Sequence, residues 1–177
     1  AALSNVNTHV GPTLLNSGTL QLRNALAVQN SLVVLNTGSL IFSGSTSYTF
    51  GGLGGPANLA LTNSAGLPVS LTIKVANSDY SGIFSGNGNL IFTNSGSVSG
   101  NSYTRLIGGA GLNTGTVTIS GSSTNTDIFL ADYNNGTPNQ LSSSSGISLV
   151  GTGRLLIQGN NAFTFNTPIT GGPGQSV

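Results

Sequence analysis

The apolar residues of this chain recur in short triplets in which two large apolar side chains flank one central residue. Side chains of a β-strand alternate between its two faces, so the outer members of a triplet share one face. Asn, Ser, Thr and Gly surround the triplets and supply turns. We therefore expect strands at seven places: Leu20-Gln21-Leu22, Leu40-Ile41-Phe42, Leu59-Ala60-Leu61, Leu71-Thr72-Ile73, Leu90-Ile91-Phe92, Val117-Thr118-Ile119 and Leu155-Leu156-Ile157.

One phrase, Leu-Asn-[Ser/Thr]-Gly-[Ser/Thr]-[Leu/Val], occurs three times, at Leu15–Leu20, Leu35–Leu40 and Leu112–Val117. The first two copies begin about 20 positions apart, and the third follows after close to four further steps of about 19. A fixed period of this length is typical of stacked coils that bury their apolar faces against one another.

The repeat predicts an all-β fold, a single-stranded parallel β-helix (β-solenoid) with coils of about 20 residues. We expect one such domain over residues 1–177, with about nine coils stacked at about 4.8 Å. An antiparallel sandwich or barrel is the alternative, but it predicts turns every 8–12 residues or so without longer-range self-similarity.

A second internal match aligns Ser47–Asn63 with Ser78–Asn94. The offset between these two segments exceeds one coil, and the excess contains an additional predicted strand, Val69–Val75. Coil length is therefore expected to vary, with insertions falling between strands.

Composition excludes several classes of function. Only 4% of the 177 residues are charged and the net charge is +1, so the chain lacks the cations that nucleic-acid binding requires. Disorder is disfavoured because 37% of the residues are hydrophobic. Without Cys or Met, and with one His, the chain suggests no cofactor and no metal site. No apolar run approaches the roughly 18 residues of a membrane-spanning helix.

Two segments resemble a known family. Ser81–Asn94 reads SGIFSGNGNLIFTN and Gly153–Ile169 reads GRLLIQGNNAFTFNTPI. They resemble the passenger-associated β-strand repeat of autotransporter-type bacterial surface proteins, which pairs sGxixGxGxLxxxxsG with LxLxGxNxYxG. Ser81–Leu90 matches the first half, and Gly159–Phe163 stands where the second half has Gly-x-Asn-x-Tyr, although the closing glycine is absent. The resemblance implies a secreted β-helical stalk with no catalytic residues of its own.

The few reactive side chains do not predict an active site. The chain has three carboxylates, Asp79, Asp127 and Asp132, and an unbroken strand would send the last two to opposite faces. His9 lies in a predicted loop without a nucleophile motif. The glycine runs at 51–55 and 108–111 are expected to be turns, because neither precedes a Lys-[Ser/Thr] pair or a helix.

Two further groups of residues have predicted structural roles. We expect the aromatic residues next to turns to fill the core, the alternative being stacking on sugars. They are Tyr48, Phe50, Tyr80, Phe84, Tyr103, Tyr133, Phe163 and Phe165. The side-chain amides of Asn16, Asn36, Asn63 and Asn94 are expected to form hydrogen-bonded ladders between coils.

The triplets also suggest a partner. Their central residues should face outward, and three of these, Ile41, Ile91 and Leu156, are apolar. If they align, they form a lateral interface. The open ends of a β-helix also invite end-to-end stacking, so self-association is expected.

Together these features predict a non-catalytic structural protein outside the cell, in a filament or sheath or as a cell-surface stalk. The absence of Cys and the single Lys suit an exported protein. The alternative is an adhesin that binds surface glycans through an aromatic, Asn and Thr face. A polysaccharide-active enzyme is disfavoured by the scarcity of carboxylates. Ice binding is disfavoured because no Thr-x-Thr array repeats along the sequence.

Overall fold

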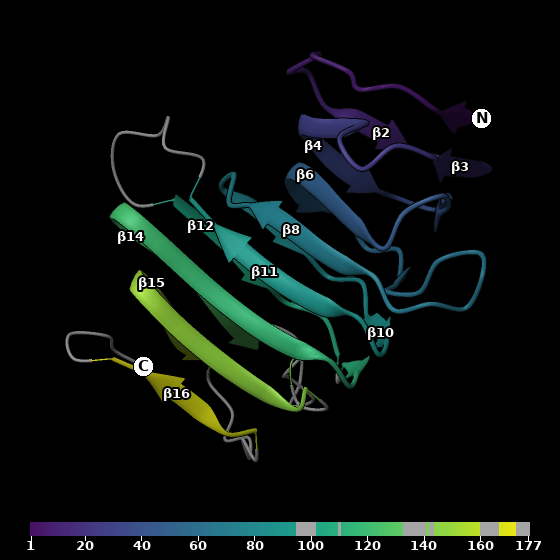
Figure 1. Ribbon diagram of the computed structural model, residues 1–177. Coiled ribbons are helices and arrows are strands. Elements are labelled where there is room, and N and C mark those ends of the chain that lie inside the picture. Colours follow the sequence, from purple (N-terminus) through teal and green to yellow (C-terminus); the bar gives the residue numbers. More distant parts are fainter. Residues whose placement is uncertain (95–101, 110, 133–140, 142–143, 160–166, 173–177) are drawn as a thin grey trace.

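The computed structural model describes residues 1–94, 102–109, 111–132, 141, 144–159 and 167–172 (Figure 1). Side chains are not described for residues 102, 122–127, 129–132 and 159. The described chain is a β-solenoid of about six turns with coils of about 22 residues, and it contains no helix. The predicted fold class is confirmed. The coils are slightly longer than the expected length of about 20 residues.

The described strands form three sheets. The first has the order β1 (Ala2–Leu3), β3 (Thr19–Leu22), β5 (Ser39–Phe42). The second has the order β13 (Leu112–Asn113), β10 (Phe84–Gly86), β7 (Leu59–Ala60). The third has the order β16 (Ile169–Gly171), β15 (Gly146–Gly159), β14 (Thr116–Asp132), β11 (Asn89–Thr93), β8 (Ser70–Lys74), β6 (Ser47–Gly54), β4 (Val28–Leu35), β2 (Thr13–Leu15). Off this path, β12 (Ser102–Leu106) pairs with β14 and β9 (Ser78–Tyr80).

The two longest strands each belong to two faces of the solenoid. The first part of β14 pairs with β11 and its last part pairs with β12, with a register shift between Gly121 and Thr126. Strand β15 follows the same course beside it. All pairings between the named strands are parallel, which excludes the alternative sandwich for the described chain.

The first two copies of the repeated phrase stack as predicted. Leu15 pairs with Leu35, Leu20 pairs with Leu40, and Asn36 Nδ2 donates to Asn16 Oδ1 at 2.6 Å. This amide pair confirms one expected rung of an Asn ladder. Asn63 also bonds the preceding coil, because its Nδ2 donates to the carbonyl oxygen of Ser45 at 3.2 Å, while its Oδ1 accepts hydrogen bonds from the backbone of its own turn at Ala65 and Leu67.

The third copy of the phrase does not continue this stack. Its Leu112 pairs with Ser85 on the sheet of β7, β10 and β13, and its side chain is 63% exposed. The reason is that coil length changes along the chain. Bonded side chains in adjacent coils are 20 residues apart at Asn16 and Asn36 but 27 apart at Asn89 and Thr116. A spacing near four coils therefore does not bring this copy to the same corner.

The match between Ser47–Asn63 and Ser78–Asn94 also does not describe neighbouring rungs. It aligns Leu59 with Leu90, whereas Leu59 pairs with Phe84 and Leu90 pairs with Leu71 on a different sheet. The additional strand predicted within the offset is confirmed as β8. Both segments share strand and turn composition without sharing a place in the coil.

The core is a continuous apolar interior formed by the inward sides of the sheets. Both outer residues of the first six triplets are buried, as predicted. In the seventh triplet Leu155 is buried but Ile157 is 48% exposed, so the prediction is wrong for Ile157. Strand β16 pairs with Ile147–Leu149, and no described strand covers β15 at Ile157.

The glycine run at 51–55 lies mainly in β6 and is not a turn. A Cβ atom on Gly51 would overlap the backbone of Asn30 and Ser31, so only glycine fits between these coils. In the run at 108–111, residue 110 lies outside the described residues, and Gly108 and Gly109 form a bend.

Candidate functional site

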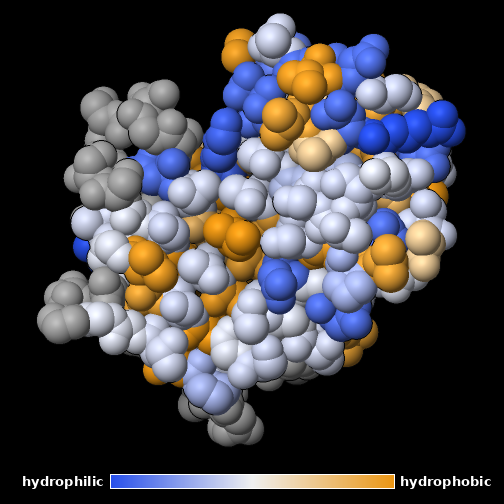
Figure 2. Space-filling view, viewed as in Figure 1, coloured by the Kyte–Doolittle hydropathy of each residue, from blue (hydrophilic) through white to orange (hydrophobic). Residues whose placement is uncertain are grey.

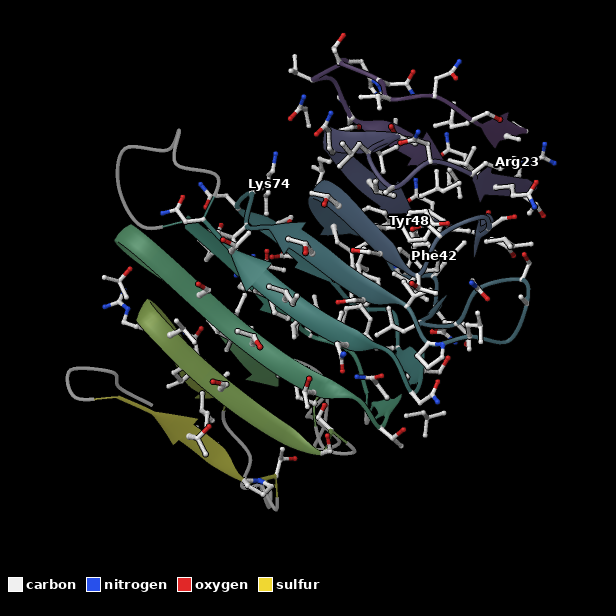
Figure 3. The ribbon with its side chains drawn as sticks, viewed as in Figure 1. Arg23, Phe42, Tyr48 and Lys74 are labelled. Carbon is white, nitrogen blue, oxygen red and sulfur yellow. The ribbon has the colours of Figure 1, made fainter. Side chains whose placement is uncertain are left out.

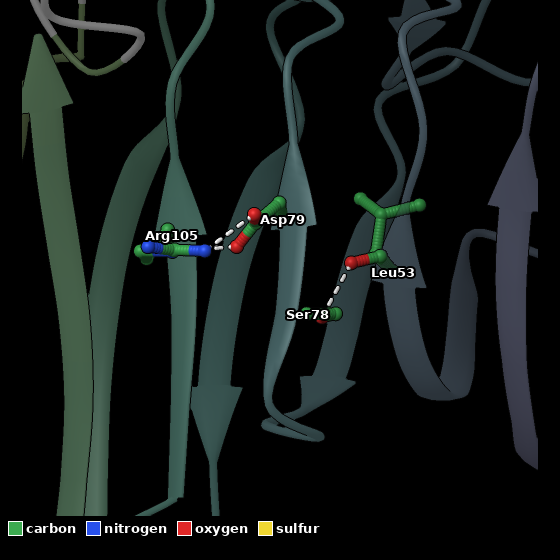
Figure 4. A network of polar contacts seen from close by, with 4 residues as sticks. All are labelled: Leu53, Ser78, Asp79 and Arg105. Carbon is green, nitrogen blue, oxygen red and sulfur yellow. Dashed lines mark hydrogen bonds and ion pairs between the residues drawn. The ribbon is translucent and has the colours of Figure 1, made fainter. Parts of the chain in front are cut away.

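Asp79 takes part in an ion pair between adjacent coils. Its carboxylate binds Arg105 through two hydrogen bonds of 2.6 Å, from Nε and Nη2 (Figure 4). Arg105 also lies 5.7 Å from the ring centroid of Tyr103. Both charged side chains are partly exposed, so the pair contributes about 0–1 kcal/mol and mainly fixes the register of β9 against β12.

A contact deeper in the same strand joins the coils from within. Ser78 is 8% exposed, and its Oγ donates to the carbonyl oxygen of Leu53 at 2.7 Å (Figure 4). The hydroxyl therefore satisfies a buried acceptor of the preceding coil.

The other titratable candidates are separate from this pair. His9 is exposed and its Nε2 lies 3.0 Å from Thr13 Oγ1. Asp127 pairs through its backbone with Tyr103 and Arg154, and the ladder between β14 and β15 from Thr126 to Asp132 is unbroken. Within the described residues, no group of three or more His, Cys, Asp or Glu side chains could hold a metal ion.

Half of the aromatic residues predicted to fill the core are confirmed there. Phe42 packs against Tyr48 and Phe50 at centroid distances of 4.7 Å and 6.1 Å, and Tyr80 packs against Phe84 at 4.7 Å. Tyr48, Phe50, Tyr80 and Phe84 are at most 1% exposed, which removes them from any sugar-binding face. Of the others, Tyr103 is half-buried, whereas Tyr133, Phe163 and Phe165 lie outside the described residues.

The two buried tyrosines bind the backbone through their hydroxyl groups. Tyr48 Oη donates to the carbonyl oxygen of Ser43 at 2.7 Å, and Tyr80 Oη donates to that of Ala57 at 3.1 Å. Burial raises the pKa of both phenols above the ordinary value, more strongly for Tyr80.

The three apolar residues of the expected lateral interface lie on three different ladders. Ile41 pairs with Gln21, Ile91 lies between Thr72 and Thr118, and Leu156 pairs with Phe129. Ile41 is 40% exposed, while Ile91 and Leu156 are half-buried. The structure therefore does not bring them together into one stripe.

A different surface emerges on the outward side of the largest sheet. Successive strands β6, β8, β11, β14, β15 and β16 place one residue each on a single row, here named the hydroxyl row. Its members are Thr49, Thr72, Ile91, Thr118, Ser148 and Thr170. All of them except Ile91 carry a hydroxyl group, and Figure 3 shows short oxygen-tipped side chains along β8, β14 and β15.

The sequence alone does not reveal this row. Thr72 and Thr118 are central residues of predicted triplets, but Ser148 and Thr170 belong to no triplet. Irregular coil lengths conceal the alignment, because Thr118 and Ser148 are neighbours on the sheet although a long coil separates them in the sequence. Ser148 between the apolar residues Ile147 and Leu149 signals an outward hydroxyl group on this strand, but it does not give the alignment with Thr118.

A shallow groove of about 380 Å³ lies over the C-terminal part of this row. Residues from β14, β15 and β16 line it, with Thr116, Thr118, Ser148 and Thr170 presenting hydroxyl groups. Gly146 pairs with Thr116 and carries no side chain, which leaves a hollow beside the row. The exposed ring of the proline at 168 completes the wall. We name this the hydroxyl groove.

The surface around the groove is weakly polar. Figure 2 shows this side of the molecule as mostly pale, with hydrophobic patches between and strongly hydrophilic residues concentrated toward the N-terminal coils. Among the described residues no helix has the length and apolarity needed to cross a membrane.

Comparison of the chain with models of known families, with curated proteins and with solved structures finds no match in any of the three. The class that the fold defines is a parallel β-solenoid.

Proposed function

We propose that the chain is a non-catalytic structural protein of the cell exterior, a β-solenoid rod that serves as a surface stalk or as a filament subunit. The observation that carries this proposal is the use of polar side chains to join one coil to the next. These contacts include Asn36–Asn16, Ser31–Thr13, Ser78–Leu53, Thr116–Asn89 and Arg105–Asp79. They span 18 to 27 residues along the chain, about one coil each.

The distribution of these contacts supports a mechanical role. They occur from β2 to β14 on different faces, and each lies between adjacent coils. Individually the hydrogen bonds contribute about 0.5–1.5 kcal/mol and the exposed ion pair about 0–1 kcal/mol, but repetition along the axis resists separation of the coils. A solenoid built this way is stabilised by interactions between nearest neighbours.

The first coil supports end-to-end stacking. Val6, Val10 and Leu14 are 51%, 80% and 55% exposed. Leu14 also lines a hollow of about 400 Å³, together with Ala1, Leu3, Leu15, Leu20 and the polar residues His9, Thr13, Ser17 and Thr19. An apolar surface of this kind suits contact with a further coil. A second copy of the chain would supply that coil in a filament, and adjoining sequence would supply it in a stalk.

Location outside the cell is supported by composition and by the resemblance of Ser81–Leu90 to the passenger repeat. The segment comprises the turn after β9, strand β10 and the start of β11, so its glycines lie at a corner of the solenoid. Gly82 and Gly88 leave no room for a Cβ, because each would overlap a backbone oxygen of the preceding coil. The motif thus describes close stacking, as a stalk requires.

Rod formation is tested by measuring the mass and shape of the purified chain over a range of concentrations. Light scattering and negative-stain electron microscopy should show particles that lengthen along one axis as concentration rises. Leu14→Glu, at the first coil, should reduce lengthening, whereas Val150→Glu, on the outer side of β15, should leave it unchanged. A chain that stays monomeric at all concentrations would overturn the filament form of the proposal and leave the stalk form.

The stalk form has its own test. Tethered at both ends in an optical trap, a stalk should unfold coil by coil at high force, because adjacent coils hold each other through the contacts above. Collapse in one step at low force would overturn it.

A further inference from the structure

The hydroxyl groove holds polar groups that the fold does not use. Thr118 and Ser148 are half-buried, and their hydroxyl groups form no hydrogen bond within the described part of the chain. Both lie on the hydroxyl row, in register on neighbouring strands about 4.8 Å apart. Each hydroxyl can donate one hydrogen bond and accept two. We propose that the hydroxyl groove binds a neutral polysaccharide chain.

At the Thr116 side of the groove, the donor and acceptor roles of the hydroxyl group are fixed. Thr116 Oγ1 donates to Asn89 Oδ1 at 2.9 Å, so its proton is engaged and its lone pairs are left for a ligand. Thr170 Oγ1 makes only a long contact of 3.4 Å to the carbonyl oxygen of Ile147. The groove therefore offers acceptors at Thr116 and both donors and acceptors at Thr118 and Ser148. Sugar hydroxyl groups, which donate and accept, complement this mixture.

The absence of charge in the lining selects a neutral ligand. None of the described residues that line the groove is charged. A carboxylate, sulfate or phosphate placed there would lose hydration without gaining a cationic partner. Lys74, a cation at the end of β8, lies two strands from β14 and bonds Asn30 Oδ1 at 3.3 Å.

The apolar parts of the lining complete the match to a sugar. The ring of Pro168 forms an exposed wall, and the threonine side chains add methyl groups beside their hydroxyls. Pyranose rings present C–H groups on their faces and hydroxyls at their edges, so one ligand can satisfy both kinds of surface. Threonine is restricted at χ1, and the strands beneath are fixed by parallel ladders, so little entropy is lost on binding.

The shape of the groove favours a chain over a flat crystal surface. The groove crosses β14, β15 and β16, so its polar groups repeat along a line perpendicular to the strands. Ice would require a level surface, but the hollow at Gly146 and the apolar side chain of Ile91 interrupt the array. A polysaccharide can settle into the hollow and lie across the three strands that line the groove, without reaching β8. This inference goes beyond the structural role proposed above and does not depend on it.

The test uses variants that alter the groove without altering the fold. A Cβ at Gly146 would have its nearest neighbour, the Pro168 carbonyl oxygen, at 3.9 Å, so Gly146→Gln fills the hollow without a backbone clash. Thr118→Val removes an unpartnered hydroxyl and keeps the shape of the side chain. Ser70→Gln and Thr72→Val are matched controls on β8, in the same two rows but outside the groove.

Binding is measured by affinity electrophoresis and calorimetry with laminarin, dextran and galactomannan, and with alginate as a polyanionic comparison. We expect saturable binding to at least one neutral polysaccharide and none to alginate. Gly146→Gln and Thr118→Val should each weaken binding about tenfold or more, while the β8 variants retain wild-type affinity. Circular dichroism and thermal unfolding check that all four variants are folded.

Three results of the binding measurements would overturn the proposal. They are no binding to any of the neutral polysaccharides, equal weakening by the groove and β8 variants, and preferential binding to alginate. Incorporation of the protein into a slowly growing ice front, lost in Thr72→Val as much as in Thr118→Val, would assign the whole row to ice and also overturn it. Should Gly146→Gln fail to fold, Thr118→Val alone decides between these outcomes.

Discussion

The inner and outer sides of β8, β11, β14 and β15 belong to the same strands but obey different constraints. On the inner side, Leu71, Leu90, Val117 and Ile147 form a row of side chains that are at most 1% exposed. On the outer side, the adjacent positions of the same strands form the hydroxyl row, in which Ile91 stands among threonines and serine. The inner row is uniform because stacking coils must exclude water. The side chains of the outer row do not have to exclude water between coils, so they are available to bind a ligand.

The largest expected contrast between the two sides is at neighbouring residues of β11. Phe92 is fully buried, so Phe92→Ala should lower the free energy of unfolding by about 3–5 kcal/mol through lost burial and a cavity. Ile91 faces outward and is half-buried, so Ile91→Ala should cost less than about 1.5 kcal/mol. Urea unfolding of both variants measures the difference. Equal losses would contradict the assignment of the two sides.

Close approach of coils gives the second contrast. Gly51→Ala places a Cβ against the backbone of Asn30 and Ser31, which must move, and we expect a loss of about 1–3 kcal/mol. At Gly11 an added Cβ meets nothing within 4 Å, so Gly11→Ala should leave stability within about 0.5 kcal/mol of wild type or raise it. Thermal unfolding distinguishes the two, and a harmless Gly51→Ala would show that the coils are not in contact there.

The buried phenol of Tyr80 makes the free energy of unfolding depend on pH, which gives a further test of the inner side. Because burial raises the pKa of Tyr80, the unfolded chain loses this proton as pH passes about 10 while the folded chain keeps it. Its contribution to stability is complete below about pH 10 and is lost above it, at up to about 1.4 kcal/mol per pH unit. Tyr48 adds to the loss in the same direction.

Tyr80→Phe should therefore lower stability by about 1 kcal/mol at neutral pH, through the lost hydrogen bond to Ala57, and reduce the alkaline decline. Urea unfolding between about pH 8 and 11 measures both effects. An unchanged alkaline slope in the variant would exclude Tyr80 as its source.

The smallest expected effect concerns the exposed amide pair between the first coils. Asn36→Ala removes the hydrogen bond to Asn16 and should cost about 0.5–1 kcal/mol. Asn16→Ala should cost a similar amount, and the double variant no more than about that same amount if the pair acts as a unit. Additive losses in this double-mutant cycle would show that the two amides act independently.

Local pattern was a reliable guide to what each strand buries. Alternation within the triplets correctly placed Leu71 and Phe92 inside and Thr72 outside, because adjacent side chains of a strand point to opposite faces. The repeated phrase likewise predicted that Leu15 stacks on Leu35, where one coil separates two copies of the same corner.

Register over longer distances was not predictable in the same way. Leu112 carries the repeated phrase yet lies exposed at another corner, because coils of unequal length intervene. The hydroxyl groove was missed for the same reason, since Thr118 and Ser148 become neighbours only after a long coil closes between them. The pattern within one strand likewise does not distinguish the exposed Ile157 from the buried Leu155.

Unequal coils joined by constant ladders have a geometric consequence. Each complete circuit adds one strand spacing of about 4.8 Å to the height, whether it contains 20 residues, as at Asn16 and Asn36, or 27, as at Asn89 and Thr116. Additional residues within a coil therefore widen its cross-section and do not change the height that it adds along the axis. Insertions within a coil would therefore leave the length of the solenoid along its axis unchanged. Only the gain of whole coils during evolution would make the molecule longer.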